Sequence, residues 1–544
     1  MIRWLADKSF WSPTVLAILV GGLVYRTIVA TWLPVGFDEA YYYLYSRYLH
    51  WSYFDHPTMV ALVTGVGWWL TGIISPLTIR LGALGLYSIS LVLLCRSASH
   101  LYSLAVGQVT LTLASLIPLF TIGFGILTSP DNGLILFWSA TLLVALQEFF
   151  PRSGAATDWR PYTPSWRIAL LGLVVGLACL SKYHGFILGI SLVGFCLSCR
   201  PYRRALLSPW VLAALAVFIL SLFPLWYWNS QHDWISFRFQ LGMRFDRDSS
   251  NSHFNLLQML VYWLVSNVYL FPLFGLPLWW VVMDRTGRLL AATFRSQGSQ
   301  QSYPLALLLW LSLPIMLLFT VLGGKQQVFP AWPAPGYWGA TVLLGAQAVA
   351  WQQQRPGWVR RWLWGSGCFL ALLSLLALLH INQGLFQKPN SYVPWAGLVP
   401  VKQDGSTELL DILQLRRSLQ DHPAVQKVLP GIGFVFTNQY YLGGYLDMAL
   451  HPLAPIPVTA FSQDPRGFAF WFNQNQWLGK DALFMTLERF ATQPEIIDQY
   501  RPLFEEIQPL TVIPLYRAGA VTETIHIFLA KKFSQTYGYP YGND

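Results

Sequence analysis

Apolar residues along this chain come in repeated blocks of about 20, the length that a helix needs to cross about 30 Å of hydrocarbon. Eleven blocks are predicted to span a membrane, at about residues 13–33, 76–95, 103–122, 131–148, 168–181, 183–199, 208–228, 258–283, 303–322, 331–350 and 362–381. A further block at 59–74 is short and contains Trp68 and Trp69, so we expect it to lie along the interface. The pattern predicts a polytopic α-helical membrane protein.

The charges beside these blocks predict which side each loop occupies. With the N-terminus inside, the inner loops hold fifteen Lys and Arg residues, and the outer loops of the membrane part hold seven. This distribution agrees with the positive-inside rule. A span at 59–74 would put the arginine-rich loops outside, so we reject that topology and place everything after the last span outside.

Composition supports this division. Of the 544 residues, 54% are hydrophobic and 11% are charged, against about a quarter charged in soluble domains. The net charge is +10 overall, +12 for residues 1–384 and −2 for residues 385–544. The basic excess therefore indicates membrane topology and not nucleic-acid binding. In the tail, strand-like runs at 433–437 and 524–529 alternate with amphipathic stretches such as 407–419, which predicts a small extracytoplasmic α/β domain over 385–544.

Acidic residues gather on the first outer loop, 34–75. Asp38 and Glu39 follow the first span directly, four tyrosines including Tyr42 come next, and Asp55 and His56 follow. Two acidic clusters on one loop can surround a single site, with aromatic rings that stack on a sugar or border the lipid. The alternative is helix capping, because Asp is a favoured N-cap residue.

Two further polar residues lie at the outer ends of apolar blocks. Asp131 precedes the fourth span, where it can also cap the following helix. Lys182 lies between two apolar blocks with almost no loop. A lysine so close to hydrocarbon is costly without a partner. A phosphate or carboxylate partner is one interpretation of Lys182, and snorkelling to the interface is the other.

Outer cations provide candidates for binding phosphate. Arg244, Arg247 and His253 lie on the loop 228–256, and Lys325 lies in a Gly- and Pro-rich loop that predicts a fixed, non-helical path. Guanidinium groups pair bidentately with phosphate oxygens, although a solvated charged loop is the simpler reading. The carboxylates leave a divalent metal possible, but no spacing is diagnostic of a metal site. We expect that no metal or other cofactor is required.

Five ordered segments, 36–57, 128–138, 176–185, 223–240 and 325–335, resemble the bacterial members of the dolichyl-phosphate-mannose protein mannosyltransferase family, which includes the aminoarabinose transferases of lipid A. The resemblance covers about residues 10–350. It implies the GT-C architecture, with many transmembrane helices, helices along the membrane in the first outer loop, and a catalytic Asp on that loop. It also implies a bacterial inner (plasma) membrane and a polyprenyl-phosphate-linked sugar as donor.

These observations favour an inverting glycosyl transfer to a lipid, glycan or protein acceptor. Asp38 is the candidate base, and Asp131 and Glu39 orient the substrate or hold the base. The remaining candidates divide between the leaving phosphate and the acceptor: Lys182, Arg244, Arg247, His253 and Lys325 for the first, and Tyr42, Asp55 and His56 for the second.

Two other functions stay open. A transporter or lipid flippase would place ionisable groups near the midplane on broken helices, whereas here they cluster at one face, which favours a one-sided enzyme. A ligase that moves a whole glycan is not separated from single-sugar transfer by the residues alone.

Overall fold

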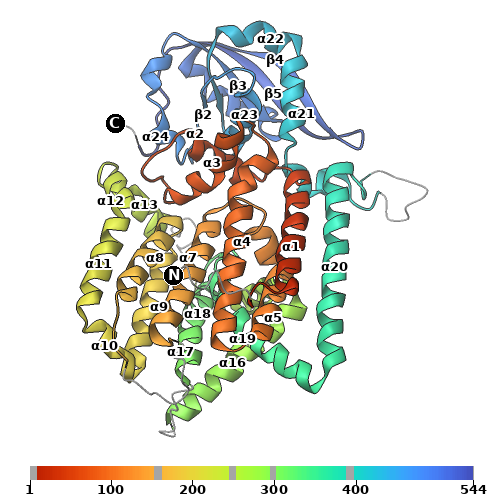
Figure 1. Cartoon of the computed structure of the whole chain (residues 1–544). Coiled ribbons are helices and arrows are strands. Elements are labelled where there is room, and N and C mark those ends of the chain that lie inside the picture. The colour runs from red at the N-terminus through yellow and green to blue at the C-terminus, as the bar shows by residue number, and fades with distance from the viewer. Residues whose placement is uncertain (1–8, 152–161, 244–252, 295–301, 388–396, 543–544) are drawn as a thin grey trace.

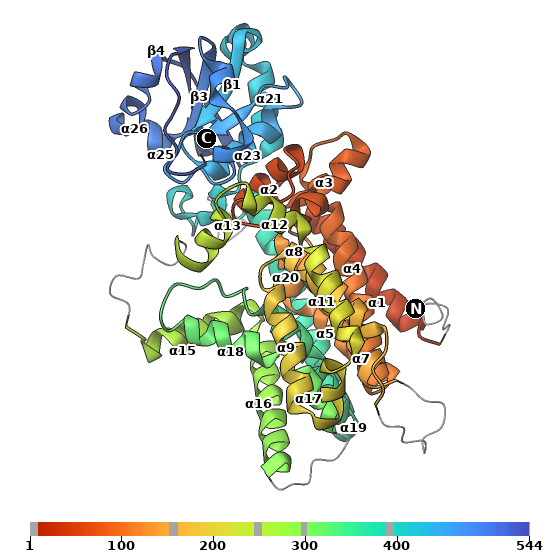
Figure 2. The ribbon, with the colours of Figure 1, turned by 90° about the vertical axis from the view of Figure 1, so that its left-hand side faces the viewer.

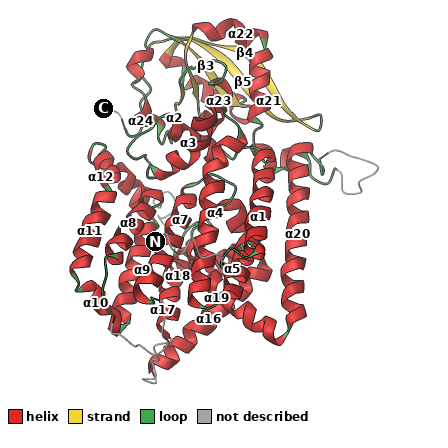
Figure 3. Cartoon of the chain, in the orientation of Figure 1, coloured by secondary structure: helices red, strands yellow, loops and turns green. Residues whose placement is uncertain are grey.

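The structure is a computed structural model that describes residues 9–151, 162–243, 253–294, 302–387 and 397–542. Helices make up its larger part, and a sheet domain near the C-terminus lies at one end of them (Figure 1). Among the described elements, strands occur only at that end (Figure 3). The predicted helical part followed by a C-terminal sheet domain is thus confirmed.

Five helical segments of the described chain are long and apolar enough to cross a membrane. They are α1 (Pro13–Trp32), α4 (Pro76–Leu101), α7 (Pro130–Phe149), α17 with α18 (Tyr303–Trp310 and Leu313–Leu322) and α20 (Pro356–Gln383). The number rises to eight if each of three bent helix pairs crosses as one unit. The other predicted blocks also fall on helices, among them α5 (Leu104–Leu116), α8 (Arg167–Ser181), α9 (Gly185–Ser198) and α19 (Ala334–Gln354).

One predicted block, 258–283, is not a single straight helix. It divides into α15 (Leu256–Tyr269) and α16 (Pro272–Phe294), which are bent by 118°. Phe271 has a φ of 65°, and Pro272 begins α16. Proline lacks a backbone N–H and disfavours helical backbone at the residue before it, so the chain turns at this point. The pair α11 (Pro209–Ser221) and α12 (Phe223–Ser230) bends less, by 49°.

The first outer loop forms two helices, α2 (Phe37–Arg47) and α3 (Met59–Thr71), which lie between the sheet domain and the long helices (Figure 1). Helix α3 has 13 residues, or about 20 Å at 1.5 Å per residue, too short to cross about 30 Å of hydrocarbon. It packs very closely on α4. A Cβ on Gly67 would lie 2.0 Å from the Thr78 carbonyl oxygen, and one on Gly82 would lie 2.1 Å from that of Val63.

The sheet domain contains five strands in the order β2-β1-β3-β5-β4. The strands are β1 (Ile432–Thr437), β2 (Val458–Ala460), β3 (Asp481–Leu487), β4 (Phe504–Arg517) and β5 (Ala520–Phe533). Pairs β1/β2 and β1/β3 are parallel, whereas β3/β5 and β4/β5 are antiparallel. Helices α21 (Ile412–Asp421) and α23 (Tyr440–Leu450) pack with α2 and one sheet face in a shared apolar core. The domain is therefore joined to the first outer loop by its own core.

The two ends of the helical part differ in charge. The sheet domain, α2 and α3 lie at one end, and α10 (Arg203–Leu206) and the turn from α19 into α20 lie at the other (Figures 1 and 2). That second end carries Arg203, Arg204 and Arg355. The acidic loop and these arginines thus lie at opposite ends of the helical part, and which end faces outside stays a prediction.

Candidate active site

Helix α2 is anchored by a buried ion pair. Arg80 of α4 donates from Nε to Glu39 Oε1 at 2.8 Å, and the two side chains are 0% and 3% exposed. Arg80 also donates to the carbonyl oxygens of Ala30, Leu33 and Pro34 at the end of α1. Every polar group of the pair is thus matched by partners, which offsets the cost of burying two charges. Glu39 therefore fixes the loop that carries Asp38, and its role toward the base stays a prediction.

Asp38 lies in the first turn of α2 but does not occupy the N-cap position. Gly36 is the N-cap residue, and its N–H donates to Glu39 Oε2 at 2.9 Å. Glu39 Oε1 also accepts from the N–H of Thr128 at 3.0 Å. The capping interpretation of the acidic pair thus applies to Glu39, while Asp38 stands exposed beside it.

Asp131 and Lys182 meet across α7 and α8. The ammonium of Lys182 donates to both carboxylate oxygens of Asp131, at 2.8 and 2.9 Å. The start of α7 lies tightly against the end of α8, because a Cβ on Gly133 would be 2.5 Å from Ser181 Oγ. Helix α7 is capped by Asn132, whose Oδ1 accepts from the Ser129 N–H at 2.6 Å. Capping therefore does not explain Asp131, and snorkelling does not explain Lys182, which is 7% exposed.

Tyr42 marks where the acidic groups converge. Burial raises the pKa of the Tyr42 phenol well above its ordinary value. Nearby charges modulate that pKa: three carboxylates raise it further and one guanidinium lowers it, namely Asp38, Asp55, Asp131 and Arg466. The outer loop, the start of α7 and the sheet domain therefore all contribute charges around one phenol.

Arg466 is the residue of this cluster that sequence reasoning missed. Its Nη1 lies 3.2 Å from Asp55 Oδ2, and its guanidinium lies 3.9 Å from the centre of the Tyr440 ring. Asp55 also accepts a hydrogen bond from Tyr45. Arg466 has a φ of 47°, an uncommon conformation for a residue other than glycine. The segment DPRG at 464–467 is the only sequence signal for it, and turn residues of this kind are common.

The sheet domain holds α2 through a second set of contacts. Arg47 pairs with Asp447 of α23 at 3.2 Å and lies 2.9 Å from His451 Nδ1. A Cβ on Gly444 would lie 2.2 Å from the carbonyl oxygen of Ala40, so glycine allows α23 to approach α2 this closely. Burial raises the pKa of Asp447 to about 6, although Arg47 opposes the shift. These contacts hold helix α2 of the outer loop against the sheet domain.

The tyrosines of α2 do not border lipid. Tyr41, Tyr43 and Tyr45 are 0% exposed and belong to the core shared with the sheet domain. The Tyr41 hydroxyl accepts from the N–H of Gly467 at 2.9 Å. The interpretation of these three rings as lipid-facing or sugar-stacking is wrong, because the sheet domain covers them. Tyr42, at 6% exposure, is the ring whose pKa these charged groups shift.

The remaining candidates lie in different surroundings. The ring of His56 packs edge-on against that of Tyr42 with centroids 5.6 Å apart. Lys325 is exposed, and no ion pair joins it to another described residue. His253 is also exposed. Arg244 and Arg247 lie outside the described residues.

The residues that the structure describes contain no group of three or more His, Cys, Asp and Glu side chains arranged to hold a metal ion. The carboxylates of the site are instead matched to cations of the chain: Glu39 to Arg80, Asp131 to Lys182 and Asp55 to Arg466. The site thus consists of paired charges around Tyr42 and Asp38.

Comparison with known proteins places this architecture in a class. Residues 55–228 match the family described as dolichyl-phosphate-mannose-protein mannosyltransferase. The crystal structure of ArnT from Cupriavidus metallidurans in the apo state has the same fold, with a TM-score of 0.56 at 15% identity over 94% of this chain and 97% of that chain. The resemblance seen in the ordered motifs is confirmed: the chain is similar to glycosyltransferases of the GT-C type, and it shares the fold of ArnT.

Two proteins of this class resemble the chain further. The lipid A galacturonosyltransferase RgtD of Rhizobium johnstonii is 23% identical over 333 residues, which cover 60% of this chain and 64% of that protein. The structure of the same ArnT bound to undecaprenyl phosphate has a TM-score of 0.53, again at 15% identity over 94% of this chain and 97% of that chain. The match to RgtD thus spans less than two thirds of that relative.

Proposed function

We propose that this protein is an inverting glycosyltransferase that moves one sugar from a polyprenyl-phosphate carrier to an acceptor, at the membrane face that bears the sheet domain. The supporting observation is that Asp38, Asp55 and the Asp131–Lys182 pair lie at one end of the helical part, where the three carboxylates all raise the pKa of Tyr42. A transporter would need such groups near the midplane. Undecaprenyl phosphate bound to ArnT, and the sugar transferase activity named for RgtD, agree with the proposed donor.

In this reaction, Asp38 accepts the proton of the acceptor hydroxyl as its oxygen attacks the anomeric carbon. The bond between that carbon and the phosphate oxygen breaks, and the electron pair leaves with the lipid phosphate. Attack opposite the leaving group inverts the anomeric centre. An exposed carboxylate in the first turn of α2 suits the role of base because an acceptor can reach it from outside.

The negative charge on the leaving phosphate needs cations. The Lys182 ammonium has three donors, and the two oxygens of Asp131 take two of them. The third is available to a phosphate oxygen, and exposed Lys325 is a second cation. Arg244, Arg247 and His253 are further candidates on the preceding loop. In this proposal side chains neutralise the phosphate, and no metal ion is required.

The proposed topology has eleven spans, an inside N-terminus and an extracytoplasmic sheet domain in a bacterial inner membrane. The opposite placement of the sheet domain and the arginine-bearing end supports it. Single cysteines at Ser406 and Arg355, in a background where exposed Cys368 is replaced by serine, provide the test. An impermeant thiol reagent added to intact cells should label position 406 alone. Labelling of 355 without 406 would reverse the topology.

The activity itself is tested by transfer in liposomes that contain purified protein. Undecaprenyl-phosphate sugars of different identity are supplied with lipid, glycan and peptide acceptors. We expect a single sugar to move to one acceptor class, with inverted anomeric configuration in the product. Release of free sugar into the lumen without a glycosylated product would indicate a transporter, and transfer of glycans only as intact chains would indicate a ligase.

A further inference from the structure

A cavity of about 220 Å3 lies where the first outer loop meets the sheet domain. Its floor is apolar and consists of three leucines and Tyr445 of α23. Its rim is polar and aromatic, formed by Phe37, Tyr441, Glu408, Arg489 and Glu523. Pockets for drug-sized ligands are larger, at about 300–1,000 Å3. The volume therefore suits a ligand of about one sugar unit.

The rim groups are held in place by each other. Arg489 pairs with Glu408 through Nη1 at 3.1 Å and donates from Nη2 to the Tyr441 hydroxyl at 3.1 Å. The rings of Phe37 and Tyr441 meet edge-on with centroids 6.0 Å apart. Glu523 is half-buried, and burial raises the pKa of its carboxyl group. With two carboxylates and one guanidinium, the rim carries one excess negative charge.

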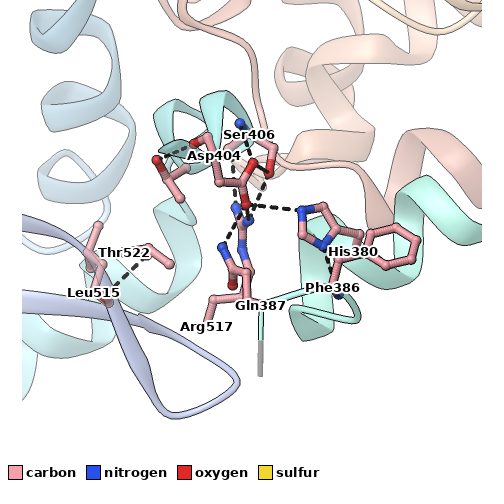
Figure 4. Close-up of polar contacts among 9 residues, drawn as sticks. His380, Phe386, Gln387, Asp404, Ser406, Leu515, Arg517 and Thr522 are labelled. Carbon is pink, nitrogen blue, oxygen red and sulfur yellow. Dashed lines mark hydrogen bonds and ion pairs between the residues drawn. The ribbon is translucent and has the colours of Figure 1, made fainter. Parts of the chain in front are cut away.

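The segments that carry Glu408 and Glu523 are tied to the end of the last long helix (Figure 4). The Asp404 carboxylate accepts hydrogen bonds from His380 Nε2 at 3.0 Å, Gln387 Nε2 at 2.6 Å and Arg517 Nη1 at 3.2 Å. His380 Nδ1 accepts from the N–H of Phe386 at 3.2 Å, which makes Nε2 the donor to Asp404.

This network contacts both chain segments that carry the rim carboxylates. Asp404 lies four residues before Glu408 in the chain, and Arg517 lies at the end of β4, in the hairpin whose other strand carries Glu523. Ser406, between Asp404 and Glu408, donates from its N–H to Asp404 at 2.9 Å and accepts from Arg517 Nη1 at 2.8 Å. The segments that carry Glu408 and Glu523 are therefore joined to each other through Asp404, Ser406 and Arg517.

The cavity adjoins the candidate base. Phe37 of its rim precedes Asp38 in α2, and Tyr445 of its floor donates from its hydroxyl to the Val35 carbonyl oxygen at 2.7 Å. Burial raises the pKa of Tyr445 most, and the carboxylates of Glu39 and Asp38 raise it further. The cavity thus lies beside the first turn of the helix that carries Asp38.

Resting on the proposed function, we propose that this cavity, beside the helix that carries Asp38, binds one uncharged or amino-sugar unit of the acceptor. Sugar hydroxyls both donate and accept hydrogen bonds, which matches carboxylates and a guanidinium. Their C–H faces pack on aromatic rings such as Phe37 and Tyr441. The excess negative charge of the rim disfavours an acidic sugar or a phosphorylated one.

Direct binding tests the cavity without relying on transfer. Saturation-transfer NMR is recorded on the full chain in nanodiscs, free of maltoside detergent that would compete, with methyl glucoside, glucosamine and glucuronate as probes. Glucosamine and the glucoside should receive saturation, and glucuronate at least tenfold less. Glu523→Gln should weaken the glucosamine signal about tenfold. The control Glu506→Gln, which removes an exposed ion pair with Lys531 on the same hairpin, should leave it unchanged.

The cavity proposal is overturned if the natural chain saturates neither glucosamine nor the glucoside, if glucuronate matches them, or if Glu506→Gln has the effect of Glu523→Gln. In the transfer assay, Glu523→Gln should raise the acceptor KM about tenfold while kcat and the donor KM change less than twofold. An unchanged acceptor KM in an active enzyme refutes the acceptor role. Absence of transfer by the natural chain, with sugar binding intact, instead refutes the proposed glycosyl transfer.

Discussion

Replacing Asp38 by asparagine separates a base from a structural carboxylate. The side chain keeps its size but loses the basic oxygen. Gly36 is the N-cap residue of α2, and Glu39 accepts the hydrogen bond from its N–H, so the substitution leaves this cap intact. The main anchor of α2, between Glu39 and Arg80, is also unchanged. The structure therefore predicts a large effect on transfer and a small one on folding.

The expected magnitudes differ enough to be decisive. A positioned base contributes about 10²–10⁴-fold to a rate, which corresponds to about 3–5 kcal/mol in the barrier at about 1.4 kcal/mol per decade. An exposed substitution away from special features changes stability by about 0.5 kcal/mol or less. Asp38→Asn should thus lower kcat by at least a hundredfold with a nearly normal thermal unfolding midpoint and donor KM.

The assay is transfer from a radiolabelled undecaprenyl-phosphate sugar in liposomes, run beside thermal unfolding of the same preparations. Asp498→Asn is a matched control, because Asp498 forms an exposed ion pair with Arg501 that is worth little. Its turnover should equal that of the natural chain. Near-normal turnover by Asp38→Asn would refute the assignment, and the base would then have to be sought among Glu39, Asp55 and Asp131.

Three further predictions follow from individual charged residues. Lys182→Ala and Lys325→Ala should each weaken donor binding about ten- to a hundredfold, the loss of a contact worth about 1.5–3 kcal/mol. Only Lys182→Ala should also destabilise the protein, because Lys182 is buried and paired. Unchanged donor binding in both variants would show that neither lysine binds the donor phosphate. Arg466→Gln and Asp55→Asn should show a coupling energy of about 1.5–3 kcal/mol in a double-mutant cycle of chemical unfolding. If the two changes in unfolding free energy add within about 0.5 kcal/mol, the 3.2 Å contact between the two side chains contributes little. Burial raises the pKa of Asp447 to about 6, so the stability that the protonated carboxyl group contributes is present below about pH 4 and is lost as the pH rises through about 6. The unfolding midpoint of Asp447→Asn, relative to that of the natural chain, should therefore rise between about pH 4 and 7. A constant difference between the two midpoints would contradict the raised pKa.

The sequence predicted the helical segments well because apolar blocks of membrane length have few other structures. It did not predict how they bend, although Pro272 inside the block 258–283 was a signal for a break. An apolar run shows only that its residues avoid water. Whether the run crosses the membrane as one helix depends on a single backbone turn, here at Phe271. The count of eleven spans therefore stays a prediction.

For the site, the sequence identified acidic residues but not the pairs in which they occur. Glu39 and Asp38 are adjacent in the chain, yet Arg80, 41 residues from Glu39, makes one of them structural. Arg80 is one of the seven cations that the charge pattern assigns to the outer loops, and its burial could not be predicted from composition. Arg466 is 411 residues from Asp55. A contact of that separation depends on how the sheet domain docks, which no local pattern reports.

The composition of α2 nevertheless contained a signal for that docking. Eight of its 11 residues are buried, among them Tyr41, Tyr43 and Tyr45. A helix that is apolar on one stripe faces either lipid or a core, but a helix with tyrosines on several sides needs partners for their hydroxyls on several sides. Lipid supplies no such partners, and water would not bury the rings. Only another part of the protein satisfies both requirements, and here the sheet domain does so through Gly467, which bonds the Tyr41 hydroxyl beside Arg466. The domain is therefore part of the structure that positions the candidate base, and a variant that loosens its docking should lose transfer before the membrane helices lose their fold.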